Sequence, residues 1–123
     1  MSWDLKTDRP IYTQLLELIQ IRIMNGTYPL GSKLPSVREL ATEASVNPNT
    51  MQKALVELEQ KGFVFSQRTS GRFVTEDEQL IIKVKEKLAQ EYLEEFRSKM
   101  KQIGYDEEAI RGLVGCLKND LES

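Results

Sequence analysis

The stretch SVNPNTMQKAL, residues 45–55, places short polar side chains around a proline at the start of an apolar helical pattern. Asn47 is a favourable N-cap, because its side-chain oxygen can accept a backbone N–H of the first turn. Pro48 suits the first helical position, where a missing N–H leaves no bond unmade. Gly62 is typical of a residue that ends a helix. We therefore expect a helix that begins at Pro48 and stops near Gly62.

This predicted helix has one apolar and one polar face. Apolar side chains recur at the spacing of a buried helix face at Met51, Ala54, Leu55 and Leu58. Asn49, Gln52 and Lys53 lie away from that face on a helical wheel. The polar face starts at the N-terminus, where free N–H groups and a partial positive charge favour a phosphate. The pattern indicates a helix end that can approach DNA closely.

A shorter helix is predicted just before this one. Residues 36–39 read SVRE, a Ser-x-x-Glu capping box. Apolar residues follow at helical spacing, at Val37, Leu40, Ala41 and Ala44. Arg38 points away from that face, and the break at residues 45–46 is tight. Two short helices joined by a tight turn are typical of a helix-turn-helix.

The flanking segments complete a small domain. Pro10 is expected as the first residue of an earlier helix, which the Asn-Gly pair at 25–26 ends. Its predicted buried face consists of Ile11, Leu15, Leu18 and Ile19. Residues 63–75 read as two short β runs around the tip RTSG, where Gly71 would relieve backbone strain. Three helices followed by a hairpin predict a winged helix-turn-helix.

The C-terminal segment reads as helix from Glu76 onward. Its apolar residues recur every three or four positions, at Leu80, Val84, Leu88, Tyr92, Phe96, Met100 and Ile103. Gly104 then breaks the run and Asp106 can cap a second helix. That helix carries Ile110, Leu113, Val114, Leu117 and Leu121. The stripe predicts a dimer surface; the alternative is that it folds back onto the first module in a monomer. Cys116, between these positions, is expected to be a buried small hydrophobe.

Charge divides the chain at the same place. Residues 1–75 carry 9 basic and 7 acidic side chains, whereas residues 76–123 carry 8 and 12. The sign of the net charge changes at TEDEQ, residues 75–79. We therefore expect a winged helix-turn-helix DNA-binding domain at 1–75 and a helical dimerisation region at 76–123. The fold class is mainly α with a small β-hairpin.

Several classes of function are disfavoured by composition. The chain has no histidine, one cysteine and no Gly-rich phosphate loop, so the usual general base and metal ligands are missing. No cofactor, metal site or enzymatic activity is predicted. The segment MSWDLKTDRP lacks the apolar region of a secretory signal, and no apolar run reaches the length of a membrane span. A single cysteine fits a reducing compartment, so a cytoplasmic location is expected.

The run PIYTQL…G…PLGSKLPSVRELATEASVNPNTMQKALVELEQKGF…SGRFV, within residues 9–75, resembles the DNA-binding domain of the GntR family of bacterial transcription regulators. The proline-led helix, the segment G-KLPS-REL, the helix NT---AL--L---G and the wing G-FV occur in order. The short tail resembles the YtrA subfamily. Two positions depart from the family pattern: Ser45 stands where Gly is frequent, and Pro48 where Arg is frequent, which shifts a contact to Asn49.

The residues and the resemblance together predict the DNA contacts. Asn49 and Gln52 are expected at base edges, where such amides favour adenine, and Thr50 at a phosphate. Asn47 either only caps its helix or also contacts DNA. The motif position of Arg38 implies a DNA contact. Lys33 is a further generic phosphate candidate. The predicted DNA-binding set is Arg38, Asn47, Asn49, Thr50, Gln52, Lys53, Arg68, Gly71 and Arg72.

The predicted function is a sequence-specific DNA-binding transcription regulator, a repressor that binds an inverted-repeat operator as a homodimer. The alternative is a winged-helix protein–protein interaction module without specific DNA binding. The expected partners are double-stranded DNA, a second copy of the chain and an unknown small-molecule effector. Two tail helices cannot enclose a pocket of the usual size by themselves. Such an effector would therefore bind at the dimer interface or in the hinge at residues 75–79.

Overall fold

The computed structural model describes the backbone of residues 3–122 and the side chains of residues 3–117, so the predicted apolar residue Leu121 lies outside the described side chains. The chain divides into two compact units, Met1–Ile82 and Lys83–Ser123. The division falls inside a helix, shortly after the segment 75–79 where the charge changes sign. Within the described residues, none of the helices is long and apolar enough to cross a membrane.

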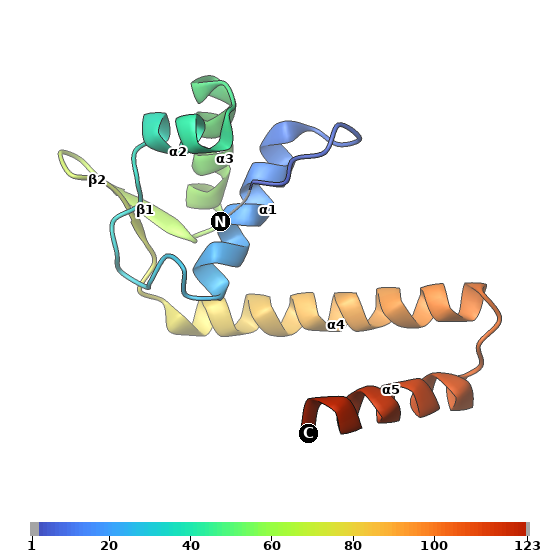
Figure 1. Cartoon of the computed structure of the whole chain (residues 1–123). Helices are drawn as coiled ribbons and strands as arrows, with labels where there is room; N and C mark the ends of the chain where they lie inside the picture. Colours follow the sequence, from blue (N-terminus) through green and yellow to red (C-terminus); the bar gives the residue numbers. More distant parts are fainter. Residues whose placement is uncertain (1–2, 123) are drawn as a thin grey trace. The chain divides into compact units, whose positions relative to one another are not determined.

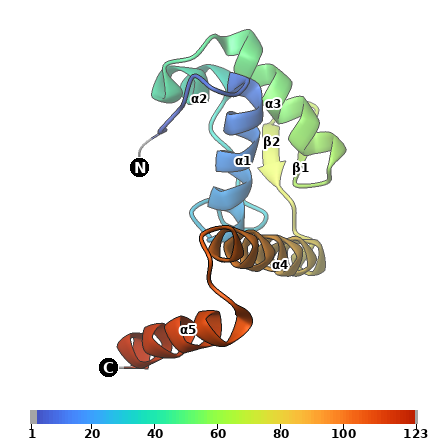
Figure 2. The same cartoon turned by 90° about the vertical axis from the view of Figure 1, so that its right-hand side faces the viewer.

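The first unit contains three helices packed around one core: α1 (Ile11–Met24), α2 (Val37–Ala44) and α3 (Pro48–Gln60). Figures 1 and 2 show α1 and α3 side by side, with α2 leading into α3. Large side chains from all three helices and the hairpin are fully buried at Leu15, Ile19, Leu40, Met51, Leu55, Leu58 and Val74. The predicted buried face of α3 is confirmed residue by residue. In α1 and α2, Ile11, Leu18 and Val37 are only half-buried.

The helix starts follow the predicted capping chemistry with one difference. The Ser36 hydroxyl accepts the Glu39 N–H and the Glu39 carboxylate accepts the Ser36 N–H, each at 3.1 Å, so the capping box is confirmed. Asn47 caps α3, and Pro48 occupies its first turn. Pro10, in contrast, is the N-cap of α1 with ψ 137°, and the helix begins one residue later at Ile11. An extended ψ at Pro10 lets its carbonyl accept the Gln14 N–H.

Two helix ends use the left-handed region of the backbone. α3 ends at Gly62, with φ +86°, where the Phe63 N–H donates to the Leu58 carbonyl. α2 ends in the same way, but its left-handed residue is Ser45, with φ 57° and ψ 45°. The Val46 N–H donates to the Ala41 carbonyl at 3.0 Å and closes the turn. This tight reversal brings α3 directly after α2, as a helix-turn-helix requires.

The wing is an antiparallel hairpin of β1 (Val64–Gln67) and β2 (Gly71–Val74), in which Val64 pairs with Val74 and Gln67 with Gly71. A third segment extends it, because Lys33 forms a bridge with Phe73. The Leu34 N–H donates to the Arg72 carbonyl at 2.9 Å. The loop before α2 is therefore fixed to the wing, and the winged helix-turn-helix fold is confirmed.

Two further helices follow the wing, α4 (Glu78–Gln102) and α5 (Glu107–Glu122). Helix α4 begins two residues later than predicted. Thr75 Oγ1 accepts the Asp77 N–H and Asp77 Oδ1 accepts the Leu80 N–H, so the chain from Thr75 to Asp77 forms a cap and not a first turn. Gly104 ends α4 with φ +102° and Asp106 caps α5, as predicted.

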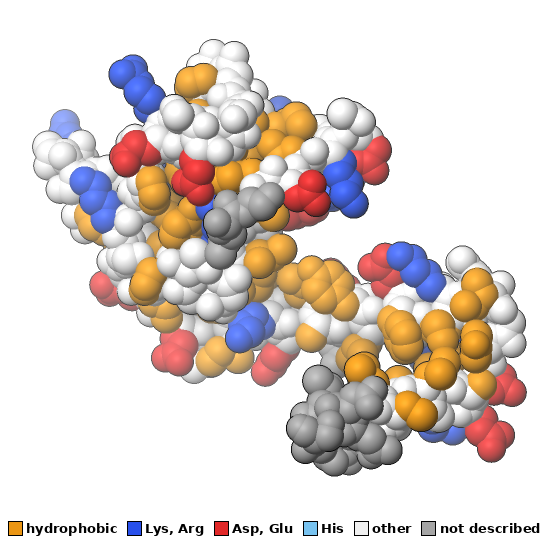
Figure 3. All heavy atoms as spheres, in the orientation of Figure 1, with side chains coloured by type: hydrophobic (Ala, Val, Ile, Leu, Met, Phe, Trp, Pro, Cys, Tyr) orange, Lys and Arg blue, Asp and Glu red, His pale blue; other side chains and the backbone are white. Residues whose placement is uncertain are grey.

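The second unit has almost no core of its own. Among residues 83–117, Ile110 alone is buried. Figure 3 shows hydrophobic side chains gathered over the C-terminal half of α4 and over α5. The most exposed large ones are Tyr92 at 55%, Leu93 at 59%, Leu117 at 55% and Ile103 at 70%. Cys116 is exposed, so its predicted burial is wrong for the single chain. The apolar stripe exists, but nothing within residues 83–117 covers it.

Candidate nucleic-acid interface

The N-terminus of α3 presents polar groups with no negative charge. Asn47 Oδ1 accepts the Asn49 N–H at 2.8 Å, and the first turn carries no acidic residue. The Asn49 side chain is exposed and Thr50 is half-buried. Because the dipole of α3 concentrates partial positive charge at this end, the turn favours an approaching phosphate. The cap bond uses the Oδ1 atom of Asn47, so its amide nitrogen takes no part in capping.

The N-terminus of α2 differs, because it is closed by its own carboxylate. Glu39 bonds back to Ser36, and these bonds, first the backbone and then the side-chain one, lower the pKa of Glu39, with a smaller contribution from Lys33. A negative charge at this helix end makes it less attractive to a phosphate than the end of α3. Arg38 lies between the two capping residues in sequence and on the exposed surface of α2.

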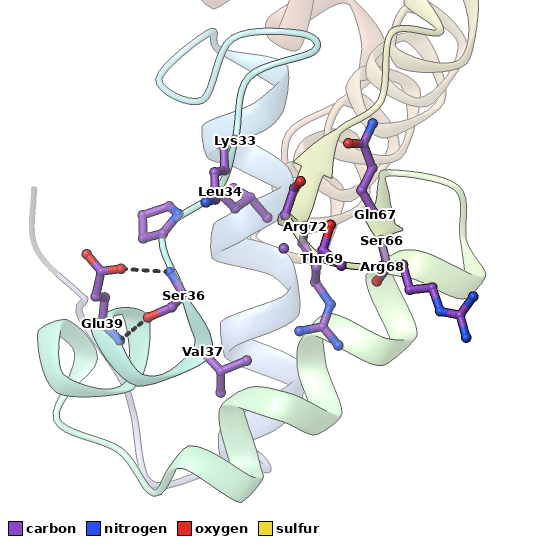
Figure 4. A pocket seen from close by; sticks show the side chains of 13 residues that line it. Lys33, Leu34, Ser36, Val37, Glu39, Ser66, Gln67, Arg68, Thr69 and Arg72 are labelled. Carbon is purple, nitrogen blue, oxygen red and sulfur yellow. Dashed lines mark hydrogen bonds between the residues drawn. The ribbon is translucent and has the colours of Figure 1, made fainter.

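A pocket of about 550 Å³ lies between the start of α2 and the wing (Figure 4). Three basic residues line it, Lys33, Arg68 and Arg72, against one acidic residue, Glu39. Gly71 has no side chain to occupy its side of the pocket. Its φ is +99°, and a Cβ there would lie 3.3 Å from Lys33 Cε. The positive φ confirms the predicted need for glycine at this position. The pocket's charge suits an anionic partner such as a phosphodiester.

Arg72 is tied to the recognition helix. Its Nε lies 3.4 Å from Glu59 Oε1 and its Nη1 lies 3.4 Å from Gln52 Oε1. The same Glu59 oxygen accepts the Ser66 hydroxyl from the neighbouring strand. Only 18% of the Arg72 side chain is exposed. The guanidinium therefore joins the wing to α3 and does not extend freely from the wing.

Lys53 is also held within the protein. Its ammonium lies 3.8 Å from the centre of the Tyr12 ring, a cation–π contact between α3 and α1. The lysine remains exposed, so its charge is still available to a phosphate. Tyr12 thus limits where this positive charge can lie beside α3.

The structure sorts the predicted residues into groups. Asn47, Asn49 and Thr50 form the N-terminus of α3, whereas Arg68, Gly71 and Arg72 line the pocket beside the wing. The hydrogen bond between Gln52 and Arg72 joins the two groups. Sequence reasoning missed Glu59. Its position, seven residues after Gln52 on the same face of a predicted helix, was a signal for it.

Residues 11–74 match the family described as "Bacterial regulatory proteins, gntR family". The chain is 38% identical over 114 residues to the uncharacterised HTH-type transcriptional regulator YhcF of Bacillus subtilis, covering 92% of this chain and 94% of that protein. It is 40% identical over 74 residues to the HTH-type transcriptional repressor YtrA of the same organism, covering 60% of this chain and 57% of that repressor.

Solved structures show the same similarity. A GntR family transcriptional regulator from Listeria monocytogenes superposes with a TM-score of 0.83 at 39% identity, covering 90% of this chain and 97% of that one. The structure of AraR(DBD) in complex with operator ORX1 superposes with a TM-score of 0.54 at 28% identity, covering 58% of this chain and 92% of that one. The second match concerns a domain bound to its operator.

Proposed function

This chain belongs to the GntR family of bacterial regulatory proteins, and on that premise we propose that it is a repressor that binds an inverted-repeat operator as a homodimer. Members of this family are transcription regulators with a winged helix-turn-helix, and not enzymes. The observation that carries the proposal is the polar, acid-free first turn of α3, presented by a helix-turn-helix beside a basic pocket.

In this proposal α3 enters the major groove by its N-terminus. Asn49 and Gln52 contact base edges, and Thr50 with Lys53 contacts phosphates. The Asn47 amide nitrogen, which its cap role leaves free, contacts the backbone beside them. Arg38, exposed on α2, is proposed to bond a guanine or a phosphate. On the wing, Arg68 and the backbone at Gly71 lie against the phosphates of the adjoining groove.

Homodimer formation rests on the apolar surface of the second unit. Exposed side chains on α4 and α5, including Phe96, Leu113 and Val114, form an apolar surface. Monomeric proteins rarely expose such a surface to solvent. A second copy of the chain would cover the same surface on both molecules, as two-fold dimers do. Two recognition helices related by a two-fold axis read half-sites about 10 base pairs apart, or a multiple of that.

Repression is the direction favoured by the similarity to YtrA, which carries the name of a repressor. A dimer seated on a promoter excludes the polymerase by occupying the same DNA. The proposed small-molecule effector remains a prediction. The pocket described above lies beside the wing, within the proposed DNA interface. It therefore does not support the expected effector site at residues 75–79.

The test is binding to duplexes carrying inverted repeats from the promoter of the chain's own gene, measured by fluorescence anisotropy over a range of salt. We expect binding that exceeds that of scrambled duplexes by at least ~10³-fold and weakens steeply as salt rises. Arg38→Ala should lose about 1–3 kcal/mol on the specific duplex. Binding that never exceeds the scrambled control would favour the alternative, a module that docks onto protein.

A further inference from the structure

Gln52 and Glu59 lie two helical turns apart on the same face of α3, and one wing residue contacts both. Arg72 donates to Gln52 Oε1 through Nη1 and lies against Glu59 Oε1 through Nε, each at 3.4 Å. The Ser66 hydroxyl donates to the same Glu59 oxygen. Both strands of the wing therefore meet α3 at the carboxylate of Glu59, and the guanidinium reaches from there to Gln52.

The donors and acceptors of these groups settle which end of the Gln52 amide faces the wing. A guanidinium carries only donors, so the amide oxygen, and not the amide nitrogen, must face Arg72. The Nε2 group then points away from Arg72. Rotating the amide by half a turn would place N–H groups against N–H groups, which is repulsive. As long as Arg72 stays beside Gln52, the exposed end of this amide is a donor.

We propose that Glu59, by holding Arg72 against Gln52, makes Gln52 a reader of guanine in the operator. This inference rests on the proposed function. Adenine offers an acceptor beside a donor in the major groove, so bidentate pairing with it needs the amide oxygen as well as Nε2, and the oxygen of Gln52 is turned toward Arg72. Guanine offers two adjacent acceptors, N7 and O6, which match a donor alone. The fixed amide therefore replaces the adenine preference that a free glutamine side chain has.

Glu59 is a positioning residue in this arrangement, because it acts through Arg72 and Gln52. Because Glu59 is also a negative charge near the proposed DNA interface, its positioning effect must be distinguished from a simple charge effect. If Glu59 acted only through its charge, its removal would strengthen binding to every duplex alike. If it positions Gln52, its removal changes the preferred base at one place in each half-site. The two explanations thus predict different observables.

The experiment selects bound duplexes from a random pool with the full chain and with four variants. Gln52→Ala identifies the base position that Gln52 reads, because the preference there should disappear. Glu59→Gln keeps an acceptor for the Ser66 hydroxyl and removes the charge that holds Arg72. Arg72→Met removes every donor from the side chain. Glu57→Gln is the matched control, since Glu57 lies on the same helix and forms no ion pair with any residue that the structure describes.

We expect the wild-type chain to select guanine at the Gln52 position by about tenfold over adenine. Glu59→Gln and Arg72→Met should each abolish that preference or turn it toward adenine, at this position alone. Glu57→Gln should leave it intact. Circular dichroism checks that each variant is folded. Agreement between the two different variants separates the positioning effect from a local folding defect.

Three results would overturn the inference while leaving the proposed function intact. These are a wild-type preference for adenine at that position, an unchanged guanine preference in both Glu59→Gln and Arg72→Met, and no altered position in Gln52→Ala. A wild-type chain that enriches no sequence at all would overturn the proposed function, and this inference with it.

Discussion

The two units of the chain are built from similar helices but differ in what those helices bury. In the first unit, Leu15, Ile19 and Leu58 are 0% exposed, and every described element before α4 contributes to one core. In the second unit, eight large apolar side chains are 40–70% exposed, and Ile110 alone is buried among residues 83–117. The difference separates a unit that buries its own apolar side chains from one that leaves them exposed in the single chain, as the proposed dimer requires.

The two regions also differ in net charge. Residues 1–75 carry a small basic excess, and the acidic excess lies in residues 76–123. In the first unit the basic side chains Lys33, Arg68 and Arg72 gather around one pocket. In the second, Arg97 and Lys101 are engaged by Glu107. The net charge of the whole chain, −2, therefore conceals a surface suited to DNA.

The largest effect is expected from truncating the core of the first unit. Leu55 is 1% exposed on the buried face of α3. Leu55→Ala should lower the free energy of unfolding by about 2–5 kcal/mol, from lost burial and the cavity left behind. Urea titration at two protein concentrations measures this. A loss below ~1 kcal/mol would contradict the assignment of this residue to a rigid core.

A comparable effect on function should follow from charging the apolar surface of the second unit. Phe96 is 41% exposed on α4. If a second copy covers it, Phe96→Asp buries an unpaired carboxylate and should leave the chain monomeric in light scattering. Operator affinity should then fall by about 100-fold, because the two DNA-binding units no longer share one binding event.

Gln90→Asp is the matched control for this variant, since Gln90 is exposed on the same helix. It should remain dimeric and bind the operator like the wild type. A Phe96→Asp chain that is still dimeric would show that the interface does not include Phe96, and the exposed apolar side chains of the second unit would need another explanation.

Local sequence signals predicted most of the first unit. The capping box at Ser36 and the cap at Asn47 act within one helical turn, the apolar spacing in α3 spans two turns, and all three are present in the structure. The start of α4 was misjudged for a local reason as well. The side chains of Thr75 and Asp77 accept backbone N–H groups and so cap the helix. In sequence, a run of acidic residues resembles a first helical turn, although such side chains can instead form these caps.

The contacts of the candidate site depend on residues far apart in sequence. Gln52 and Arg72 meet across 20 positions, and Lys53 meets Tyr12 across the interface of α3 with α1. Spacing within one element cannot show that two basic side chains are held by protein partners. The exposure of Cys116 was missed for the opposite reason. Its apolar neighbours in sequence indicate burial, but none of the residues that the structure describes covers its side chain.

A smaller effect, of opposite sign, is expected at the turn of the helix-turn-helix. Ser45 adopts φ 57° and ψ 45°, a left-handed conformation that is unfavourable for a residue with a Cβ. Ser45→Gly should stabilise the first unit by about 0.5–1 kcal/mol after allowing for the greater freedom of glycine in the unfolded chain. The proposed dimer should be unaffected, since the change is confined to the first unit.

The control is Thr42→Gly, which places glycine at an exposed position inside α2. It should destabilise by about 0.5–1 kcal/mol, because glycine there gains no conformational relief. Urea titrations of both variants measure the two shifts. A Ser45→Gly chain that is less stable than the wild type would show that the Ser45 side chain contributes more than its backbone conformation costs.

The smallest effect concerns the turn between α4 and α5. Lys101 Nζ and Arg97 Nη2 lie 2.7 and 2.6 Å from Glu107 Oε1, and these hydrogen bonds lower the pKa of Glu107 from 4.5 to about 2. A depressed pKa means that the carboxylate stabilises the turn above the unfolded pKa. That contribution is lost as the pH falls from about 4.5 through about 2.

Because these groups are exposed, the effect should be small and should weaken as salt rises. Glu107→Gln should remove this pH dependence from the protection of residues 103–106 against amide hydrogen exchange, measured in the full chain relative to the intrinsic rate at each pH. Glu108→Gln, whose parent carboxylate forms no ion pair with the described residues, should retain it. If the protection of these amides in Glu107→Gln, relative to the intrinsic exchange rate at each pH, still falls between pH 4.5 and 2 as in the wild type, the pH dependence does not come from the ion pairs of Glu107.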